Sequence, residues 1–256
     1  MNTYTTIKVS EQKGALTIQL YRPEANNSIN ATLMKEIRTA LAHAESNNEI
    51  KVVILEGLPD NFCTGMDFKA VSDGSSEALM GGDSNEYYEV LKHFSLSSKI
   101  IIAKVEGKVN AGGIGLVAAS DIVVADTKAT FGLSEALFGL LPACVMPFLI
   151  RRIGYQKALW MTLTTQGISA DRAFQIGLVD ELSTNVHDTV RKNLLRLTRL
   201  ETGTIKDLKE YISKLWIINE QTQKLAVDKI TSLIGSEKVQ SNIKNFIQNG
   251  KFPWDK

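Results

Sequence analysis

The sequence is poor in the residues that mark secreted, metal-binding or nucleic-acid-binding proteins. Its 256 residues include three histidines and two cysteines, and Cys63 and Cys144 lack the C-x-x-C spacing of a metal site. So few cysteines favour a reducing, intracellular compartment over a disulfide-stabilised fold. Basic and acidic residues nearly balance, 29 against 28, so the basic excess of nucleic-acid-binding proteins is missing.

Long hydrophobic runs and an N-terminal targeting pattern are missing as well. Gly, Asp or Lys interrupts each apolar stretch well short of the ~20 residues that cross a membrane. Residues 1–14 contain no basic region followed by an apolar run. We therefore expect a cytoplasmic protein with no membrane partner, no nucleic-acid partner and no metal. Hydrophobic residues still make up 44% of the chain, enough for a sizeable core.

Short apolar runs alternate with helical patterns in the first part of the chain, which indicates an α/β fold with a mainly parallel sheet covered by helices. Strands are expected at 14–20, 51–56, 100–105 and 121–126, helices at 31–47 and 86–96, and a mobile surface loop at 72–85. The pattern then becomes helical, at 156–163, 169–176, 186–200, 204–219 and 221–234. A break near 195–204 divides a core, residues 1–195, from a helical C-terminal region, residues 196–256.

A glycine-rich turn, NAGGIG at 110–115, precedes an apolar helical segment. The first N–H groups of a helix are unpaired, and glycine lets a ligand approach them closely, so the turn suits an anion such as a developing oxyanion. The glycines are equally explained by tight packing of a strand against a helix. The turn is not a P-loop, because no GK[ST] follows, and its spacing is not that of a dinucleotide fingerprint.

Three segments in a fixed order carry a family resemblance: FCTGMD at 62–67, NAGGIG at 110–115, and FGLSE at 131–135 with FGLLP at 138–142. Over about residues 10–185 they resemble the enoyl-CoA hydratase/isomerase (crotonase) superfamily. The resemblance implies a crotonase (ClpP/crotonase-like) fold of repeated ββα units with a helical C-terminal region, assembled as a homotrimer or hexamer. It also implies that the backbone N–H groups of Met66 and Gly112 form an oxyanion hole for an acyl thioester.

Many hydratases of the family that this chain resembles carry two glutamates at the active site. At one of these positions this chain has Gly115, and at the other it has Glu135. Glu135 could serve first as general base and then as general acid, and its structural alternative is a carboxylate at a helix start. Asp67 is a candidate second acid, although an Asx-type cap of its loop is the favoured reading.

Three more residues are candidate substrate contacts. Lys108 and Asn110 flank the glycine-rich turn and could meet a polar or anionic group, or could be an exposed strand end and a turn former. Cys144 is expected to be an apolar wall residue, because a nucleophilic cysteine needs a base such as histidine and no histidine lies in a motif. Cys63 is interpreted in the same way.

Longer segments are similar to one branch of the superfamily, the polyketide-biosynthesis enoyl-CoA hydratase homologues of β-branching cassettes: 22–31, 107–115, 133–154, 194–200 and 252–254. That branch dehydrates a 3-hydroxy-3-methylglutaryl (HMG) group on an acyl carrier protein to 3-methylglutaconyl-carrier protein. The resemblance implies the same lyase activity here, with an HMG-synthase-like enzyme and a decarboxylase as pathway partners. It implies no cofactor apart from the phosphopantetheine, or CoA, that carries the substrate.

Two other functions remain open. A Δ-isomerase or decarboxylase of the same superfamily is compatible with glycine at position 115, whereas a non-catalytic trimeric scaffold would have little use for the retained oxyanion motif and Glu135. For carrier recognition we expect the pantetheine arm to enter beside Met66 and Lys69. The candidate contacts to an acidic carrier protein are Lys206, Lys209 and Lys214.

Overall fold

A computed structural model describes residues 4–67, 82–215 and 218–255. Lys69 and most of the loop expected at 72–85 lie outside the described residues, and the last residues of that loop belong to a helix. Within the described ranges, no helix is both long enough and apolar enough to cross a membrane.

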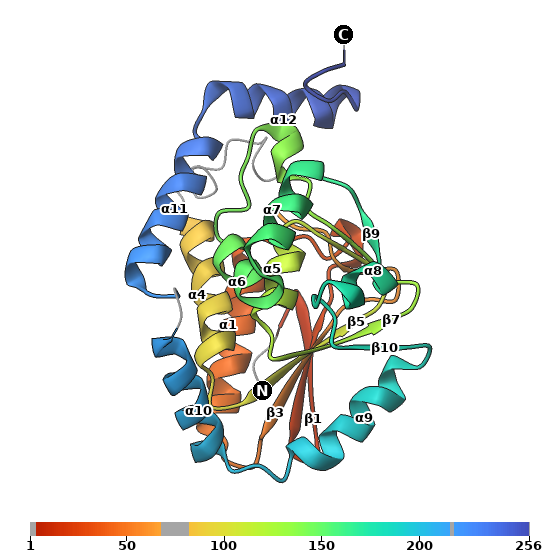
Figure 1. Cartoon of the computed structure of the whole chain (residues 1–256), viewed down its shortest axis with the longest axis vertical. Helices are drawn as coiled ribbons and strands as arrows, with labels where there is room; N and C mark the ends of the chain where they lie inside the picture. Colours follow the sequence, from red (N-terminus) through yellow and green to blue (C-terminus); the bar gives the residue numbers. More distant parts are fainter. Residues whose placement is uncertain (1–3, 68–81, 216–217, 256) are drawn as a thin grey trace.

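The main sheet has six strands, and all its neighbours are parallel except the first pair (Figure 1). β1 (Ile7–Gln12) pairs antiparallel with β2 (Ala15–Leu20). Parallel pairing then continues through β3 (Val52–Glu56), β5 (Ile100–Val105), β7 (Ile122–Asp126) and β10 (Glu181–Ser183). The expected mainly parallel sheet is therefore confirmed. In β2 the apolar Leu16, Ile18 and Leu20 are buried and the polar residues between them are only partly buried, so the half-buried strand that the alternating sequence predicts is confirmed.

Alternate side chains of the central strands enter two different cores, as the period of a strand requires. In β3, Val53 and Leu55 join the large core, whereas Val52 and Ile54 face the smaller core beneath α9 (Val186–Leu197). Both faces are apolar because helices cover both. This explains why these strands have continuous apolar sequences.

A second, four-stranded sheet consists of β4 (Asn61–Cys63), β6 (Lys108–Asn110), β8 (Thr130–Gly132) and β9 (Ile168–Ser169). β4, β6 and β8 are parallel neighbours, and each follows a strand of the main sheet along the chain. This succession gives the ββα repeats that the family resemblance implied. Because the strands are parallel, their carboxyl ends lie at one edge of the sheet. The three sequence motifs therefore meet there.

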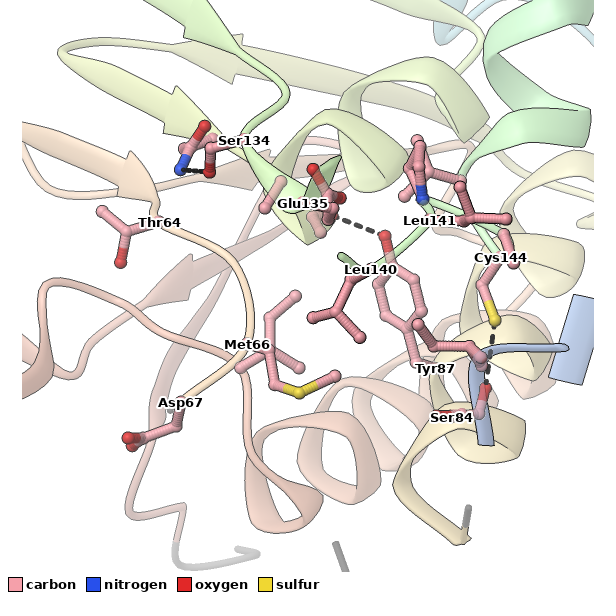
Figure 2. Close-up of a pocket in the computed structure, with 18 of the residues that line it drawn as sticks. Thr64, Met66, Asp67, Ser84, Tyr87, Ser134, Glu135, Leu140, Leu141 and Cys144 are labelled. Carbon is pink, nitrogen blue, oxygen red and sulfur yellow. Dashed lines mark hydrogen bonds between the residues drawn. The ribbon is translucent and has the colours of Figure 1, made fainter. Parts of the chain in front are cut away.

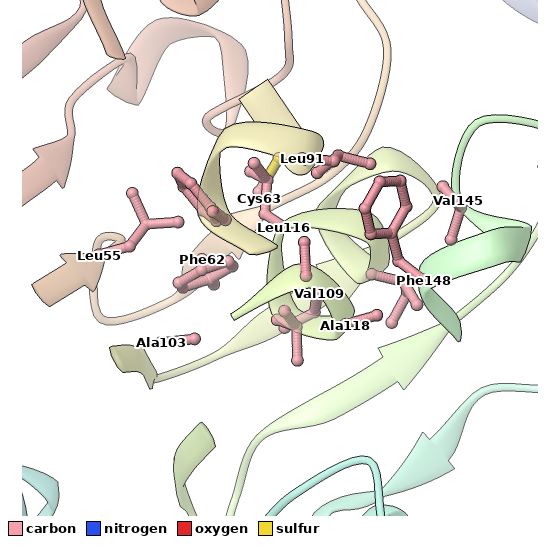
Figure 3. Close-up of a cluster of buried hydrophobic side chains, with 14 of the residues drawn as sticks. Leu55, Phe62, Cys63, Leu91, Ala103, Val109, Leu116, Ala118, Val145 and Phe148 are labelled. Atoms are coloured by element: carbon pink, nitrogen blue, oxygen red, sulfur yellow. The ribbon is translucent and has the colours of Figure 1, made fainter. Parts of the chain in front are cut away.

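Helices pack around these sheets. α1 (Ala31–Ser46) begins as expected at Asn30, whose side chain accepts a hydrogen bond from the Leu33 N–H at 2.9 Å. The apolar helix α5 (Gly112–Ala119) is buried in the interior, where Leu116 and Ala118 lie in the cluster that also holds Phe62 and Phe148 (Figure 3). The other helices of the core are α4 (Gly82–Leu96), α6 (Met146–Ile153), α7 (Tyr155–Thr164) and α8 (Ala170–Gln175), with short 3-10 turns η1 (Pro23–Ala25) and η2 (Glu135–Phe138).

Three helices form the C-terminal region: α10 (Thr202–Lys214), α11 (Glu220–Ile234) and α12 (Glu237–Asn249). α10 and α11 pack along α4, and α12 packs on η2, where Phe246 lies edge-on to Phe138 at 5.1 Å (Figure 1). The helix expected at 204–219 ends at Lys214, and α12 was not expected from the sequence. The division at residue 195 stays a prediction; it falls within α9, which packs on the main sheet.

Candidate active site

The three motifs line one pocket of about 160 Å³ at the shared edge of β4, β6 and β8 (Figure 2). The loop after β4 contributes Met66 and the start of α5 contributes Gly112, while Glu135 comes from the start of η2. Helices complete the wall: Ser84 and Tyr87 of α4, and Ile230 of α11. The predicted oxyanion donors and the predicted acid–base group therefore face the same space.

Met66 lines the pocket and forms an isolated parallel bridge with Ile29. Ile29 donates to the Gly65 carbonyl at 2.7 Å and accepts from the Asp67 N–H at 3.0 Å. In such a bridge the N–H of the residue between these two points the opposite way. The Met66 N–H thus faces away from Ile29, and among the described residues it has no acceptor.

The Gly112 N–H is the first of α5 and has no acceptor within the described chain. The two donor segments are close together, because a Cβ added to Gly65 would lie 3.2 Å from the Gly112 nitrogen. Ala111, which precedes Gly112, has φ 49° and ψ −120°, a left-handed conformation that a side chain disfavours by about 1–3 kcal/mol. Two free N–H groups in one pocket are the donors that an oxyanion hole requires.

The neighbouring glycine shows that the packing interpretation of the turn also holds. A Cβ on Gly113 would lie 2.4 Å from the carbonyl oxygen of Cys63, so α5 can approach β4 only with glycine there. The two readings of the turn therefore apply to different residues: Gly112 faces the pocket and Gly113 allows the close packing.

Glu135 is the ionisable group at the centre of the pocket. Its Oε2 is shielded from solvent and has no hydrogen-bond partner among the described residues. Burial raises the pKa of Glu135 to about 7, although the N–H groups of Glu135 and Ser134 act in the opposite direction. A carboxyl group with a pKa near neutrality can both take and return a proton at physiological pH, which is what general acid–base catalysis needs.

Asn110 holds the Glu135 segment in place. Its side-chain amide donates to the Ser134 hydroxyl at 2.8 Å, which joins the end of β6 to the residue before Glu135. The side chain is therefore occupied in positioning, although Asn110 also lines the pocket.

Asp67 is engaged outside the centre of the pocket. Its Oδ2 lies 3.1 Å from Nη2 of Arg22, both side chains are largely buried, and Figure 2 shows the carboxylate pointing away from Glu135. Arg22 also donates to the Ser28 carbonyl. This ion pair ties the loop after β4 to the segment before α1, which supports the structural reading of Asp67.

Two other candidates have different positions. Cys144 lines the pocket, and burial raises the pKa of its thiol to about 12, so at neutral pH it is a protonated wall residue. Lys108 is exposed at the start of β6 and does not line the pocket. Burial likewise raises the pKa of Cys63 to about 12, and Figure 3 shows it within the core.

The lysines proposed for carrier contact all lie on α10 and do not line the pocket, so their contact with a carrier protein stays a prediction. Lys209 is buried in an ion pair with Asp121 at 2.6 Å and donates to the carbonyls of Phe94 and Lys99. Phe94 is near the C-terminal end of α4, whereas Ser84 and Tyr87, which line the pocket, are nearer its N-terminal end. Lys206 and Lys214 are on the same helix, α10. A periodic pattern alone could not show that Lys209 is internal.

Sequence reasoning missed Tyr87. This residue is 8% exposed, and its hydroxyl donates to the Gly112 carbonyl at 2.5 Å. A Cβ on Gly115 would lie only 1.9 Å from the Tyr87 hydroxyl oxygen. The absence of a side chain at position 115 is thus matched by a tyrosine from another helix. No local pattern around Tyr87 signals this contact.

No metal-binding arrangement accompanies these groups. In the part of the chain that the structure describes, no group of three His, Cys, Asp or Glu side chains is placed to hold a metal ion.

The ββα repeats and the paired N–H groups beside a buried carboxyl define a crotonase-type protein, and comparison with known proteins identifies its family. The family model for enoyl-CoA hydratase/isomerase matches residues 10–256. The chain is 41% identical over 254 residues to the bacillaene synthase dehydratase PksH of Bacillus subtilis, covering 99% of this chain and 98% of that protein. The chain belongs to the enoyl-CoA hydratase/isomerase family and is a lyase-type enzyme, as the sequence predicted.

A solved structure and a more distant relative show how far the likeness extends. The crystal structure described as a polyketide biosynthesis enoyl-CoA hydratase, pksH, from Bacillus subtilis superposes with a TM-score of 0.91 at 40% identity, covering 98% of this chain and all of that one. The mevalonyl-coenzyme A hydratase sidH of Aspergillus fumigatus is 27% identical over 247 residues, covering 93% of this chain and 90% of that protein. The predicted crotonase fold is confirmed.

Proposed function

We propose that the protein dehydrates a 3-hydroxy-3-methylglutaryl thioester on an acyl carrier protein to 3-methylglutaconyl-carrier protein, in polyketide β-branching. The observation that carries the proposal is the buried carboxyl of Glu135, with a pKa of about 7, beside two backbone N–H groups that have no acceptor among the described residues. The near-full-length identity to a protein named as a polyketide dehydratase supports the substrate class.

The chemistry follows from these groups. The thioester oxygen accepts hydrogen bonds from the Met66 and Gly112 N–H groups, which stabilise the enolate that forms when the α-proton leaves. Ionised Glu135 takes that proton. The bond between the β-carbon and its hydroxyl then breaks, and Glu135 returns the proton to the departing oxygen, which leaves as water.

One carboxyl is sufficient if the hydroxyl leaves readily. The β-carbon of an HMG group is tertiary, so positive charge that develops during C–O cleavage is comparatively well stabilised. The relative sidH is named for mevalonyl-CoA, which also has its hydroxyl on a methyl-bearing tertiary carbon. Both points favour dehydration over the alternatives of Δ-isomerisation or decarboxylation.

Mass spectrometry of an HMG-loaded carrier protein incubated with the enzyme tests the proposal. We expect the acyl group to lose one water. Loss of carbon dioxide would instead identify a decarboxylase, and an unchanged HMG-carrier would contradict the proposal. Glu135→Gln is the matched control, because it preserves the shape of the side chain and removes the base.

We propose a cytoplasmic pathway in which an HMG-synthase-like enzyme supplies the substrate and a decarboxylase of the same fold consumes the product. A dedicated carrier-protein enzyme should have a higher kcat/KM for carrier-bound than for CoA-bound substrate. Equal values would contradict carrier specificity without affecting the dehydration itself.

We propose a homotrimer or hexamer as the working assembly. Apolar side chains at helical spacing on α10 and at the residue that follows it remain largely exposed in the single chain, with Leu208 at 56%, Tyr211 at 62% and Leu215 at 63%. A neighbouring subunit would bury such a face. Light scattering at micromolar concentration should give three or six times the monomer mass, and a monomer would contradict this assembly.

A further inference from the structure

The hydroxyl of Tyr87 fills the space that any side chain at position 115 would need. A Cβ on Gly115 would lie 1.9 Å from the Tyr87 hydroxyl oxygen, 3.0 Å from its ring Cζ and 3.1 Å from Cδ1 of Leu91. Contacts below 3.0 Å are not sustained by packed atoms, so position 115 cannot hold a carboxylate while Tyr87 is in place. Tyr87 thus occupies the space that a side chain at position 115 would take.

Tyr87 is held in this position by its place on α4 and by a hydrogen bond to α5. Its place on α4 puts it one helical turn before Leu91, so both side chains face α5. Its hydroxyl donates to the Gly112 carbonyl at 2.5 Å, and Figure 2 shows the hydroxyl end of the ring directed toward Glu135. The surrounding lining is mostly apolar, with Leu140, Leu141 and Cys144 close by.

We propose that the Tyr87 hydroxyl binds the departing β-hydroxyl of the substrate and donates a hydrogen bond to its oxygen while the C–O bond breaks. The inference rests on the proposed dehydration. A phenol has one O–H donor, so the hydroxyl must rotate to redirect its hydrogen bond from the Gly112 carbonyl to the leaving oxygen. The proton stays on the phenol oxygen during this rotation.

Protons and electrons balance in this step. Glu135 takes the α-proton, the electrons of the C–H bond form the new C=C bond, and the C–O electron pair leaves on oxygen. Glu135 returns its proton to that oxygen and water departs. Tyr87 keeps its own proton throughout, which is consistent with burial raising the pKa of its phenol.

The test separates the leaving-group step from enolate formation. Tyr87→Phe removes only the hydroxyl. Dehydration is measured with HMG-carrier protein, and enolate formation is measured as deuterium uptake at the α-carbon of a 3-methylglutaryl-carrier protein in D₂O. This second substrate lacks the β-hydroxyl, so its exchange needs Glu135 and the oxyanion hole but has no leaving group.

We expect kcat for dehydration to fall about 10–100-fold in Tyr87→Phe, while α-proton exchange changes by less than about threefold. Glu135→Gln should lose both activities. Tyr88→Phe is the matched control, because Tyr88 is the next residue of α4 and its buried hydroxyl has no partner among the described residues. It should leave both activities unchanged.

Two outcomes would overturn the inference. Unchanged dehydration in Tyr87→Phe would show that the hydroxyl has no part in the reaction. A parallel loss of dehydration and exchange would show that Tyr87 only supports the oxyanion hole through Gly112. If the wild type dehydrates HMG-carrier protein and Tyr87→Phe does so equally well, this inference fails and the proposed function stands.

Discussion

Glu135→Gln should stabilise the folded protein at pH 8 while it abolishes dehydration. The reason is that the pocket holds a carboxyl that has no hydrogen-bond partner for its Oε2 among the described residues, and burial raises its pKa from 4.5 to about 7. Above pH 7 the folded protein therefore contains a buried negative charge that the unfolded chain would expose to water. Glutamine has the same shape without that charge.

The magnitude follows from linkage between protonation and folding. Between pH 4.5 and about 7 the folded state holds a proton that the unfolded state has released, so the free energy of unfolding falls as pH rises through this window. Each pKa unit corresponds to about 1.4 kcal/mol. The free energy of unfolding of the wild type therefore falls by up to about 3 kcal/mol across this window, whereas that of the variant does not. For a chain of this size that is a Tm difference of roughly 6–12 °C.

Thermal unfolding followed by circular dichroism at pH 5 and pH 8 measures the effect. The two proteins should have similar Tm values at pH 5, and the variant should be more stable at pH 8. In the same preparation the dehydration rate should fall by at least about 10²-fold. A variant that is less stable than the wild type at pH 8, or a Tm difference that does not depend on pH, would refute the assignment of a raised pKa to Glu135.

Glu45→Gln provides a control of opposite sign. Burial acts to raise the pKa of Glu45, but hydrogen bonds from His93, Ser97 and Ser98 outweigh it and lower this pKa to about 2. Its carboxylate therefore stabilises the fold above pH 4.5, and this stabilisation is lost as pH falls toward 2. Glu45→Gln should lower Tm at pH 8, in contrast to Glu135→Gln.

Three further predictions concern the pocket. Because the base is the ionised form of Glu135, kcat/KM for dehydration should rise with pH and level off above about 7, and a profile that is flat from pH 5 to 8 would contradict this role. Gly115→Ala should destabilise the protein by roughly 1–3 kcal/mol in chemical denaturation, and by less in a Tyr87→Phe background, because the hydroxyl 1.9 Å from the added Cβ is gone. Asp67→Asn and Cys144→Ala should each reduce dehydration less than Glu135→Gln does. Loss of activity in a normally folded Asp67→Asn would instead assign the acid–base role to that residue.

The sequence alone was sufficient for the fold class and for three segments of the pocket. Runs such as VVILE at 52–56 have a local pattern that predicts a strand, and Asn30 predicts a helix start, because both signals lie within a few residues. The glycines at 112 and 113 indicate that the backbone is approached closely, either by a ligand or by a packed strand. The resemblance of the ordered motifs around Met66, Gly112 and Glu135 to the family implied one site, and in the structure the parallel strands bring the carboxyl ends of these motifs' strands together.

Only the tertiary structure decided what each of these groups can do. The pKa of Glu135 depends on how completely other segments exclude water from it, and sequence position does not determine burial. Lys209 has the sequence context of an exposed helix residue, yet it is internal because Asp121 and two carbonyls surround it. The contact between Tyr87 and Gly115 joins two helices far apart in the chain. Packing of one helix on another produces that contact, and no pattern within either helix contains it.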